Sequence, residues 1–133
     1  MNILVVGAGS IGKRHLKNLL HIGIANTSLF VVETRDDRQS EVKELGINNI
    51  YKSIDVVTQE KKIDAAIICS PTALHIQHGI QLAEKNINLM IEKPLSRDLT
   101  DIDRLKEVVT KNNLIVIMAY IFRFPPITKK VKD

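Results

Sequence analysis

The chain has 133 residues, enough for one domain with a buried core, and its 44% hydrophobic and 26% charged residues are typical of globular proteins. Most of the net charge of +4 lies in residues 123–133, so the body is nearly neutral and a nucleic-acid-binding surface is not expected. One cysteine excludes an intrachain disulfide, and the longest apolar run, 114–122, is too short for a membrane helix. We therefore expect a cytoplasmic protein.

The first half of the chain alternates β-branched runs with longer amphipathic stretches. A strand is predicted over 2–6 and a helix over 11–22, which Gly23 closes. A second strand over 28–33 is followed by a helix over 36–45, which begins with two acids and ends before Gly46. This is the order strand, helix, strand, helix.

The same alternation continues to the end of the chain. Residues 50–51 predict a minimal strand, and Ser53 can cap a short helix that runs to Gln59. An apolar strand over 65–69 precedes a helix over 73–85, for which Thr72 is the expected N-cap and Asn86 the left-handed end. Strands are predicted over 88–91 and 114–120, and a helix from 98 or 100 to 111 lies between them.

These elements predict an α/β fold, a doubly wound, mostly parallel six-stranded sheet with helices on both faces. We expect residues 1–121 to form this Rossmann-type domain. Residues 122–133, which contain Pro125-Pro126, are expected to begin a connection to a second domain. The apolar stretch 119–124 would then be exposed and favour self-association, which leaves a homo-oligomer open.

Gly7-Ala8-Gly9-Ser10-Ile11-Gly12 is a G-x-G-x-x-G run between a predicted strand and a predicted helix. Gly7 allows the tight turn, Gly9 lets a ligand approach the backbone, and Gly12 lets the helix pack closely on the strand. The N–H groups at the helix start, from Ser10 onward, attract phosphate oxygens. The motif in this context predicts a dinucleotide cofactor.

Glu33 stands at the end of the second strand, at about the distance from the glycines where an acid binds the adenosine ribose. A carboxylate there accepts hydrogen bonds from ribose hydroxyls and repels the 2′-phosphate of NADP. Arg35 can instead pair with that phosphate. The expected cofactor is therefore NAD, and NADP remains the alternative.

Three further segments carry a family resemblance: Ile68-Cys69-Ser70-Pro71-Thr72-Ala73-Leu74-His75, then Glu92-Lys93-Pro94-Leu95, then Tyr120-Ile121-Phe122-Arg123-Phe124-Pro125-Pro126. Together with the glycine run, they resemble the Gfo/Idh/MocA oxidoreductases. The resemblance implies an N-terminal NAD(P)-binding domain, a C-terminal substrate domain, and hydride transfer to or from the carbinol carbon of a sugar, cyclitol or nucleotide sugar.

The resemblance also implies site residues. Lys93 would lie nearest the chemistry and polarise the reacting oxygen, with Glu92 and Pro94 positioning it. The cofactor would contact a second group of residues: Ser70, Pro71, Thr72 and His75. Arg123 would bind substrate or brace the domain interface. His15 and Cys69 are expected to be structural, His78 gives no signal, and no metal site is expected.

The chain departs from the family pattern because nothing in it matches the Asp and His of the substrate domain. We therefore expect cofactor binding by this chain and no turnover by it alone. The alternative function is a stand-alone, non-catalytic NAD-binding or regulatory module. A weaker alternative is an S-adenosylmethionine-binding Rossmann domain, since Glu33 would also suit that ribose.

Overall fold

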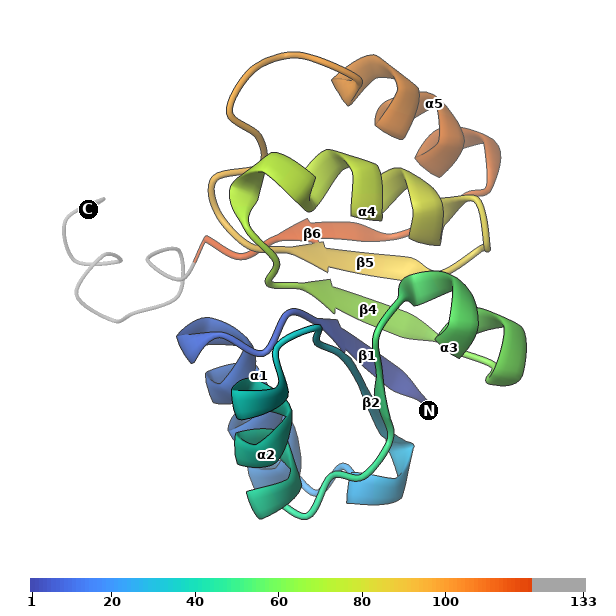
Figure 1. Cartoon of the computed structure of the whole chain (residues 1–133). Helices are drawn as coiled ribbons and strands as arrows, with labels where there is room; N and C mark the ends of the chain where they lie inside the picture. Colours follow the sequence, from blue (N-terminus) through green and yellow to red (C-terminus); the bar gives the residue numbers. More distant parts are fainter. Residues whose placement is uncertain (121–133) are drawn as a thin grey trace, which may run out of the picture.

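A computed structural model describes residues 1–120, and its centre is a six-stranded sheet in the order β3-β2-β1-β4-β5-β6 (Figure 1). All five neighbouring strand pairs are parallel. The strands are β1 (Ile3–Val6), β2 (Leu29–Val32), β3 (Ile50–Tyr51), β4 (Ala65–Ile68), β5 (Asn88–Ile91) and β6 (Val116–Met118). The predicted doubly wound Rossmann fold is confirmed.

Helices cover both faces of the sheet. They are α1 (Ser10–His21), α2 (Asp36–Glu44), α3 (Ile54–Glu60), α4 (His75–Ala83) and α5 (Ile102–Lys111), with two 3₁₀ helices, η1 (Asn26–Ser28) and η2 (Thr72–Leu74). Figure 1 shows α1 and α2 below the sheet and α4 and α5 above it. The residues of α3 belong to the same core as those of α4 and α5.

The alternation of side chains along each strand produces two cores, one on each face of the sheet. In β1, Leu4 and Val6 face α3, α4 and α5, whereas Ile3 and Val5 face α1 and α2. All four side chains are buried, as expected for a central parallel strand. Aliphatic side chains supply almost the whole core, which accounts for the scarcity of aromatic residues in the sequence.

Several local expectations are confirmed. The Ser53 hydroxyl accepts a hydrogen bond from the Val56 N–H at 3.3 Å and caps α3. Asn86 ends its helix with a φ of 61°. Gly23 and Gly46 also have positive φ angles at the ends of α1 and α2. Each is a position where an ordinary L-residue would be strained.

Other local expectations are wrong. Thr72 does not cap a helix; it begins η2, which the Leu74 N–H closes on the Pro71 carbonyl at 2.8 Å, so α4 begins only at His75. The last helix begins at Ile102 because Asp101 is left-handed, with a φ of 58°, and interrupts the helical backbone. Of the stretch 119–124 that was expected to be exposed, Ala119 is buried, Tyr120 is 57% exposed, and the other four lie outside the described residues.

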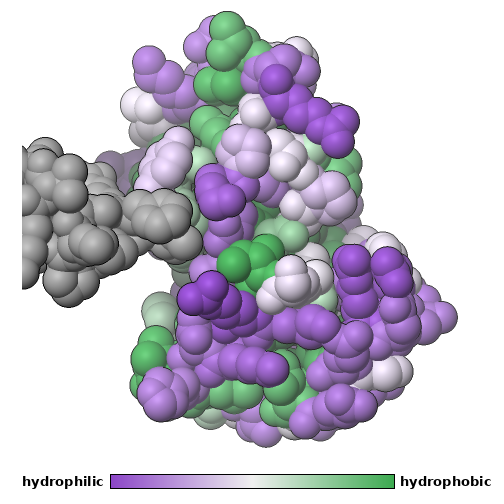
Figure 2. Space-filling view, turned by 90° about the vertical axis from the view of Figure 1, so that its left-hand side faces the viewer, coloured by the Kyte–Doolittle hydropathy of each residue, from purple (hydrophilic) through white to green (hydrophobic). Residues whose placement is uncertain are grey.

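All strands end at the same edge of the sheet, on the left in Figure 1. Chain order reverses at the centre of this edge, because β1 is followed by β2 on one side and β4 lies on its other side. Ligands of doubly wound sheets bind at such a switch point. Figure 2 looks onto this edge and shows hydrophilic side chains around a hydrophobic area.

Residues 1–120 were searched for membrane-spanning helices and for clusters of metal-binding side chains. No helix there is long and apolar enough to span a membrane. Within the same residues, no group of three or more histidine, cysteine, aspartate or glutamate side chains is placed to hold a metal ion.

Candidate functional site

The glycine-rich turn connects β1 to α1 at the switch point. Gly7 has a φ of 91°, and a Cβ on it would lie 2.9 Å from the Cys69 carbonyl oxygen, so only glycine fits there. The N-cap of α1 is Gly9, which has no side chain to accept hydrogen bonds from the first turn. The first N–H groups of α1 are therefore left for a ligand, as at anion-binding helix starts.

The other two glycines of the motif meet different neighbours. A Cβ on Gly12 would lie 2.0 Å from the Gly7 carbonyl oxygen, so the helix and the turn are in direct contact. A Cβ on Gly9 would meet only the Arg38 guanidinium, at 3.7 Å. Gly12 is thus required by the packing of the protein itself. Gly9 is not, and it leaves its backbone open to a ligand.

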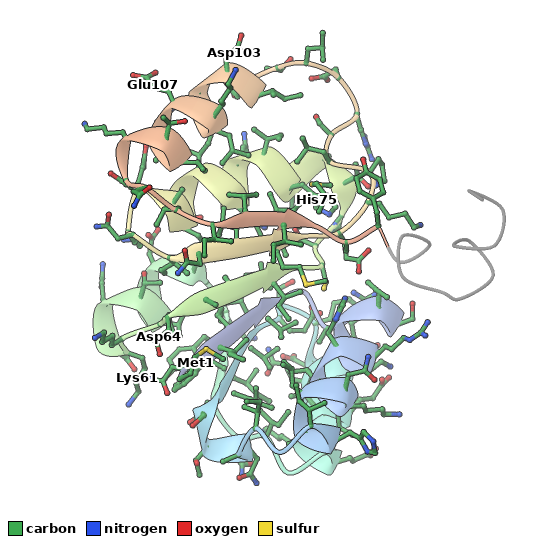
Figure 3. All side chains as sticks on the ribbon, turned by 180° about the vertical axis from the view of Figure 1, so that it is seen from behind. Met1, Lys61, Asp64, His75, Asp103 and Glu107 are labelled. Carbon is green, nitrogen blue, oxygen red and sulfur yellow. The ribbon has the colours of Figure 1, made fainter. Side chains whose placement is uncertain are left out.

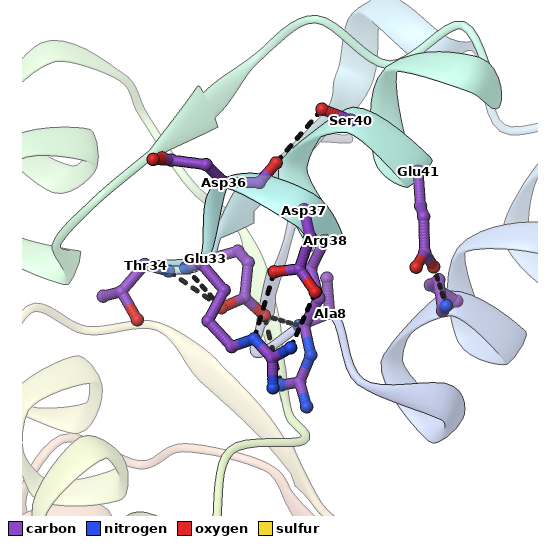
Figure 4. Close-up of polar contacts among 10 residues, drawn as sticks. Ala8, Glu33, Thr34, Asp36, Asp37, Arg38, Ser40 and Glu41 are labelled. Carbon is purple, nitrogen blue, oxygen red and sulfur yellow. Dashed lines mark hydrogen bonds and ion pairs between the residues drawn. The ribbon is translucent and has the colours of Figure 1, made fainter.

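Glu33 follows β2 and binds the backbone on both sides of the site (Figure 4). One carboxylate oxygen, Oε2, accepts a hydrogen bond from the Ala8 N–H at 2.9 Å. The other, Oε1, accepts from the Thr34 N–H at 2.9 Å and the Arg35 N–H at 3.0 Å. The residue is 5% exposed, so its carboxylate is well fixed beside the glycine-rich turn.

Two arginines of the α2 region lie close to this carboxylate. Arg38 places its Nη1 atom 3.7 Å from Glu33 Oε2, and its side chain is 36% exposed. Arg35 is instead paired with Asp37, through its Nε at 3.1 Å and its Nη2 at 2.6 Å (Figure 4). The hydrogen bond and charge of Asp37 raise the pKa of Arg35, and the arginine lowers that of Asp37.

A pocket of about 420 Å³ opens beside the glycine-rich turn, a volume within the range of small-molecule sites. It lies between the end of β2 and the β4–α4 loop. Its apolar lining includes Val6, Val32, Ile54 and Leu74, and its polar lining includes Glu33, Arg38, Lys52, Ser70 and His78. A pocket lined by both apolar side chains and charged or hydroxyl groups suits a flat ring that carries a polar sugar.

The β4–α4 loop is held by histidines. His75 is 2% exposed and points inward from the start of α4 (Figure 3). Its Nε2 lies 2.8 Å from the Ser70 carbonyl oxygen and its Nδ1 lies 2.9 Å from the Pro94 carbonyl oxygen. His78 Nδ1 lies 2.9 Å from the Ser70 hydroxyl. The two histidines therefore fix Ser70, and His75 also ties it to the segment after β5.

That segment begins with Glu92, Lys93 and Pro94, directly after β5. Glu92 is 7% exposed, whereas Lys93 and Pro94 are exposed at the sheet edge. The Lys93–Pro94 peptide bond is cis. Lys93 does not line the pocket, whose wall on this side is formed by the β4–α4 loop and by His78 and Gln81 of α4. The pocket and Lys93 thus occupy different parts of one edge.

Burial shifts the pKa values of two groups that line the pocket, Cys69 and His78. Burial, followed by the charge of Glu92, raises the pKa of the Cys69 thiol to about 12. Burial, followed by His75, lowers the pKa of His78 below its usual value. Both shifts favour the neutral forms, so neither group supplies charge to the pocket near neutral pH.

Comparison with known proteins agrees with this geometry. The family described as "Oxidoreductase family, NAD-binding Rossmann fold", GFO_IDH_MocA, matches residues 1–120. The chain belongs to this family.

Several relatives of this Gfo/Idh/MocA chain are named as dehydrogenases. It is 36% identical to the myo-inositol 2-dehydrogenase of Thermotoga maritima, covering all of this chain and 40% of the relative. It is 31% identical to the scyllo-inositol 2-dehydrogenase (NAD(+)) of Bacillus subtilis, covering 92% of this chain and 36% of the relative. The crystal structure of a probable dehydrogenase from Thermotoga maritima matches with a TM-score of 0.88 and 34% identity, over 99% of this chain and 39% of that one. The chain thus spans about two fifths of the length of these relatives.

The structure brings most of the sequence-predicted residues of this Gfo/Idh/MocA chain to one edge. Five of them line the pocket: Gly7, Glu33, Arg35, Ser70 and Pro71. Gly9, Ser10, Ile11 and Gly12 form the adjoining helix start. His75 lies beneath the edge with both ring nitrogens engaged, so its placement does not support the expected direct contact with the cofactor. Arg123 lies outside the described residues.

Sequence reasoning gave no role to Arg38, Lys52 and His78, which line the pocket, and it expected only a structural role for His15, which lies 2.8 Å from Glu92. Arg38 and His78 each lie on the helix that follows an identified motif, three residues beyond Arg35 and His75. That helical spacing was the available signal, since such residues share a face.

Proposed function

We propose that this chain binds NAD at the switch point, with the pyrophosphate on the start of α1 and the adenosine in the pocket. The observation that carries the proposal is the arrangement of Gly9 and Glu33. Gly9 leaves an open backbone at a helix start without a side-chain cap, and Glu33 lines the pocket beside it. The family description supports the same cofactor class.

NAD is favoured over NADP by the charges around the expected ribose. Glu33 Oε2 receives one N–H bond, from Ala8, so it keeps a second acceptor position for a ribose hydroxyl. A 2′-phosphate at that position would meet the carboxylate. Arg35, the candidate partner for such a phosphate, is engaged by Asp37. Arg38 is the remaining cation next to Glu33, and it neutralises part of that charge.

The experiment is calorimetric titration of the full chain with NAD and NADP. We expect NAD to bind with a dissociation constant of about 1 mM or lower and NADP to bind more weakly. The matched variant is Gly9→Ala, since its added Cβ meets ordinary contacts within the protein and obstructs only a ligand. Loss of NAD affinity in a folded Gly9→Ala chain supports the site. No binding by the folded natural chain contradicts the proposal.

The activity of a whole protein built on this domain is a further part of the proposal. The names of the relatives support hydride transfer between NAD and a carbinol of a cyclitol or sugar. Lys93 would polarise the reacting oxygen, because an ammonium group donates hydrogen bonds and stabilises developing negative charge. The reacting carbon would then lie above the edge where Lys93 is exposed.

The substrate site would be completed by a second domain, which the greater length of the relatives supports. The full chain is therefore expected to bind NAD without reducing it when myo-inositol is added. Formation of NADH, followed by its absorbance, would contradict the assignment of the remaining substrate groups to another domain.

A further inference from the structure

A buried polar contact joins two segments that the proposed function treats separately. His15 Nε2, on α1, lies 2.8 Å from Glu92 Oε1, at the end of β5. The two side chains are 15% and 9% exposed, so water screens this contact poorly. The residues are 77 positions apart in the sequence, and the contact connects the helix of the glycine motif with the segment that carries Lys93.

The second oxygen of Glu92 acts on Lys93 directly. Glu92 Oε2 accepts a hydrogen bond from the Lys93 N–H at 3.3 Å. The Glu92 N–H is itself bonded to the Ile68 carbonyl oxygen at 3.0 Å, so the sheet fixes the backbone of Glu92. One carboxylate therefore holds the peptide of Lys93 on one side and α1 on the other.

Because His15 lies on α1, its contact with Glu92 depends on where α1 lies relative to the end of β5. It lies three residues after Gly12, whose Cα is fixed by contact with the glycine-rich turn. A helix turn is rigid over this distance, so a displacement of the helix start moves the His15 ring with it. The ring can donate to Glu92 only while α1 and the end of β5 keep their present separation.

We propose that His15 and Glu92 are positioning residues that fix Lys93 relative to the phosphate-binding start of α1. The inference rests on the proposed function, which places the cofactor on α1 and Lys93 over the reacting carbon. The alternative is that the pair only stabilises the fold. Stability alone does not account for this polar contact, since replacing both partners of a buried hydrogen bond with apolar groups of the same shape can be nearly neutral.

The test measures the environment of Lys93 without any cofactor. The rate of Lys93 acetylation by acetic anhydride is followed by peptide mass spectrometry and divided by the rate at Lys106, an exposed lysine on α5. His15→Phe keeps an aromatic ring and removes the hydrogen bond, and we expect a several-fold change in this ratio. His15→Gln, whose amide can donate to Glu92, should restore it. His21→Phe, at the exposed end of the same helix, is the matched control and should leave it unchanged.

A second measurement connects the pair with the cofactor. NAD affinity should fall several-fold in His15→Phe, because the phosphate-binding start of α1 would no longer be held against the end of β5. Glu92→Leu, which also removes the acceptor of the Lys93 N–H bond, should lose at least as much, and the double variant should lose no more than Glu92→Leu because the His15 contact is already broken there. Additive losses would overturn the coupling.

The outcomes are separable. An unchanged Lys93 ratio in a folded His15→Phe chain, or failure of His15→Gln to restore it, overturns the inference. If the natural chain does not bind NAD, the proposed function fails. The Lys93 acetylation ratio still decides whether His15 and Glu92 position Lys93. If His15→Phe does not fold, the double variant His15→Phe/Glu92→Leu is compared with Glu92→Leu: equal Lys93 ratios support a role of His15 through Glu92, and different ratios overturn it.

Discussion

The carboxylate of Glu33 and the main-chain N–H of Ala8 form a hydrogen bond of 2.9 Å across 25 positions of the sequence. Through this bond the acid after β2 holds the middle of the glycine-rich turn. The acid predicted to bind the ribose therefore also shapes the turn predicted to bind the pyrophosphate. In the proposed function one side chain would therefore join adenosine and phosphate recognition, and substitution of Glu33 should affect both the fold and the cofactor.

We predict that Glu33→Ala lowers the free energy of unfolding by about 2–4 kcal/mol, since three backbone N–H groups, of which that of Ala8 is buried, lose a charged acceptor. Urea denaturation measures this change. Glu107→Ala, an exposed acid on α5, is the control and should stay within about 0.5 kcal/mol of the natural chain. A Glu33→Ala chain as stable as this control would show that the three bonds contribute little.

Glu33→Ala should also change the choice of cofactor. Removal of the carboxylate removes a ribose acceptor from NAD and a repulsive charge from NADP, so NAD affinity should fall far more than NADP affinity. Titration of the refolded variant with both cofactors measures the ratio. Equal losses would contradict the ribose assignment and leave Glu33 as a structural residue of the turn.

Alanine should act differently at two glycines of one motif. Gly12→Ala places a Cβ 2.0 Å from the Gly7 carbonyl oxygen, which forces α1 away from the turn. Alanine usually stabilises a helix interior by about 1 kcal/mol relative to glycine. Here we expect a loss of unfolding free energy instead. Gly9→Ala should be nearly neutral for stability. Thermal unfolding of both variants tests the contrast, and a stabilised Gly12→Ala chain would refute the close approach.

The fold and the location of the site followed from local patterns. Buried strands such as 65–69 are continuous apolar runs, and a glycine run between a strand and a helix has few other structural meanings. Parallel strands all end at one edge of the sheet. Because each motif follows a strand, Gly7, Glu33, Ser70 and Lys93 were expected to meet at that edge.

The contacts within the site did not follow from those patterns. Which oxygen of Glu33 meets Ala8, and whether His75 faces a ligand or the interior, depends on the packing of elements far apart in the sequence. His15 was expected to be structural, but neither its partner nor the side chain of Glu92 could be placed from spacing along the chain. The late start of α5 had a similar cause, since the left-handed Asp101 is set by its loop.

Cys69 should be unreactive in the folded chain near neutral pH. Burial and the charge of Glu92 raise its pKa to about 12, so the thiolate is scarce, and the side chain is also poorly accessible. We expect labelling by iodoacetamide to be slow in buffer and fast in urea. Binding of NAD should slow it further, because ligand binding stabilises the folded state. Fast labelling of the native chain would mean that the structure around Cys69 opens readily to the reagent.

His78 should make the chain less stable in mild acid. Burial and His75 lower its pKa in the folded state, so the unfolded chain takes up this proton at a higher pH than the folded chain. Its contribution is therefore constant above its usual pKa of about 6.5, and the free energy of unfolding falls as the pH drops below that value and through the lower folded pKa. The contribution of His78 is isolated by urea unfolding at about pH 7.5 and about pH 5.5. The proteins compared are the natural chain, His78→Gln and the control His21→Gln. His78→Gln should lose less stability between the two pH values than the other two proteins, and equal losses in all three would show that His78 titrates as freely in the folded chain as in the unfolded one.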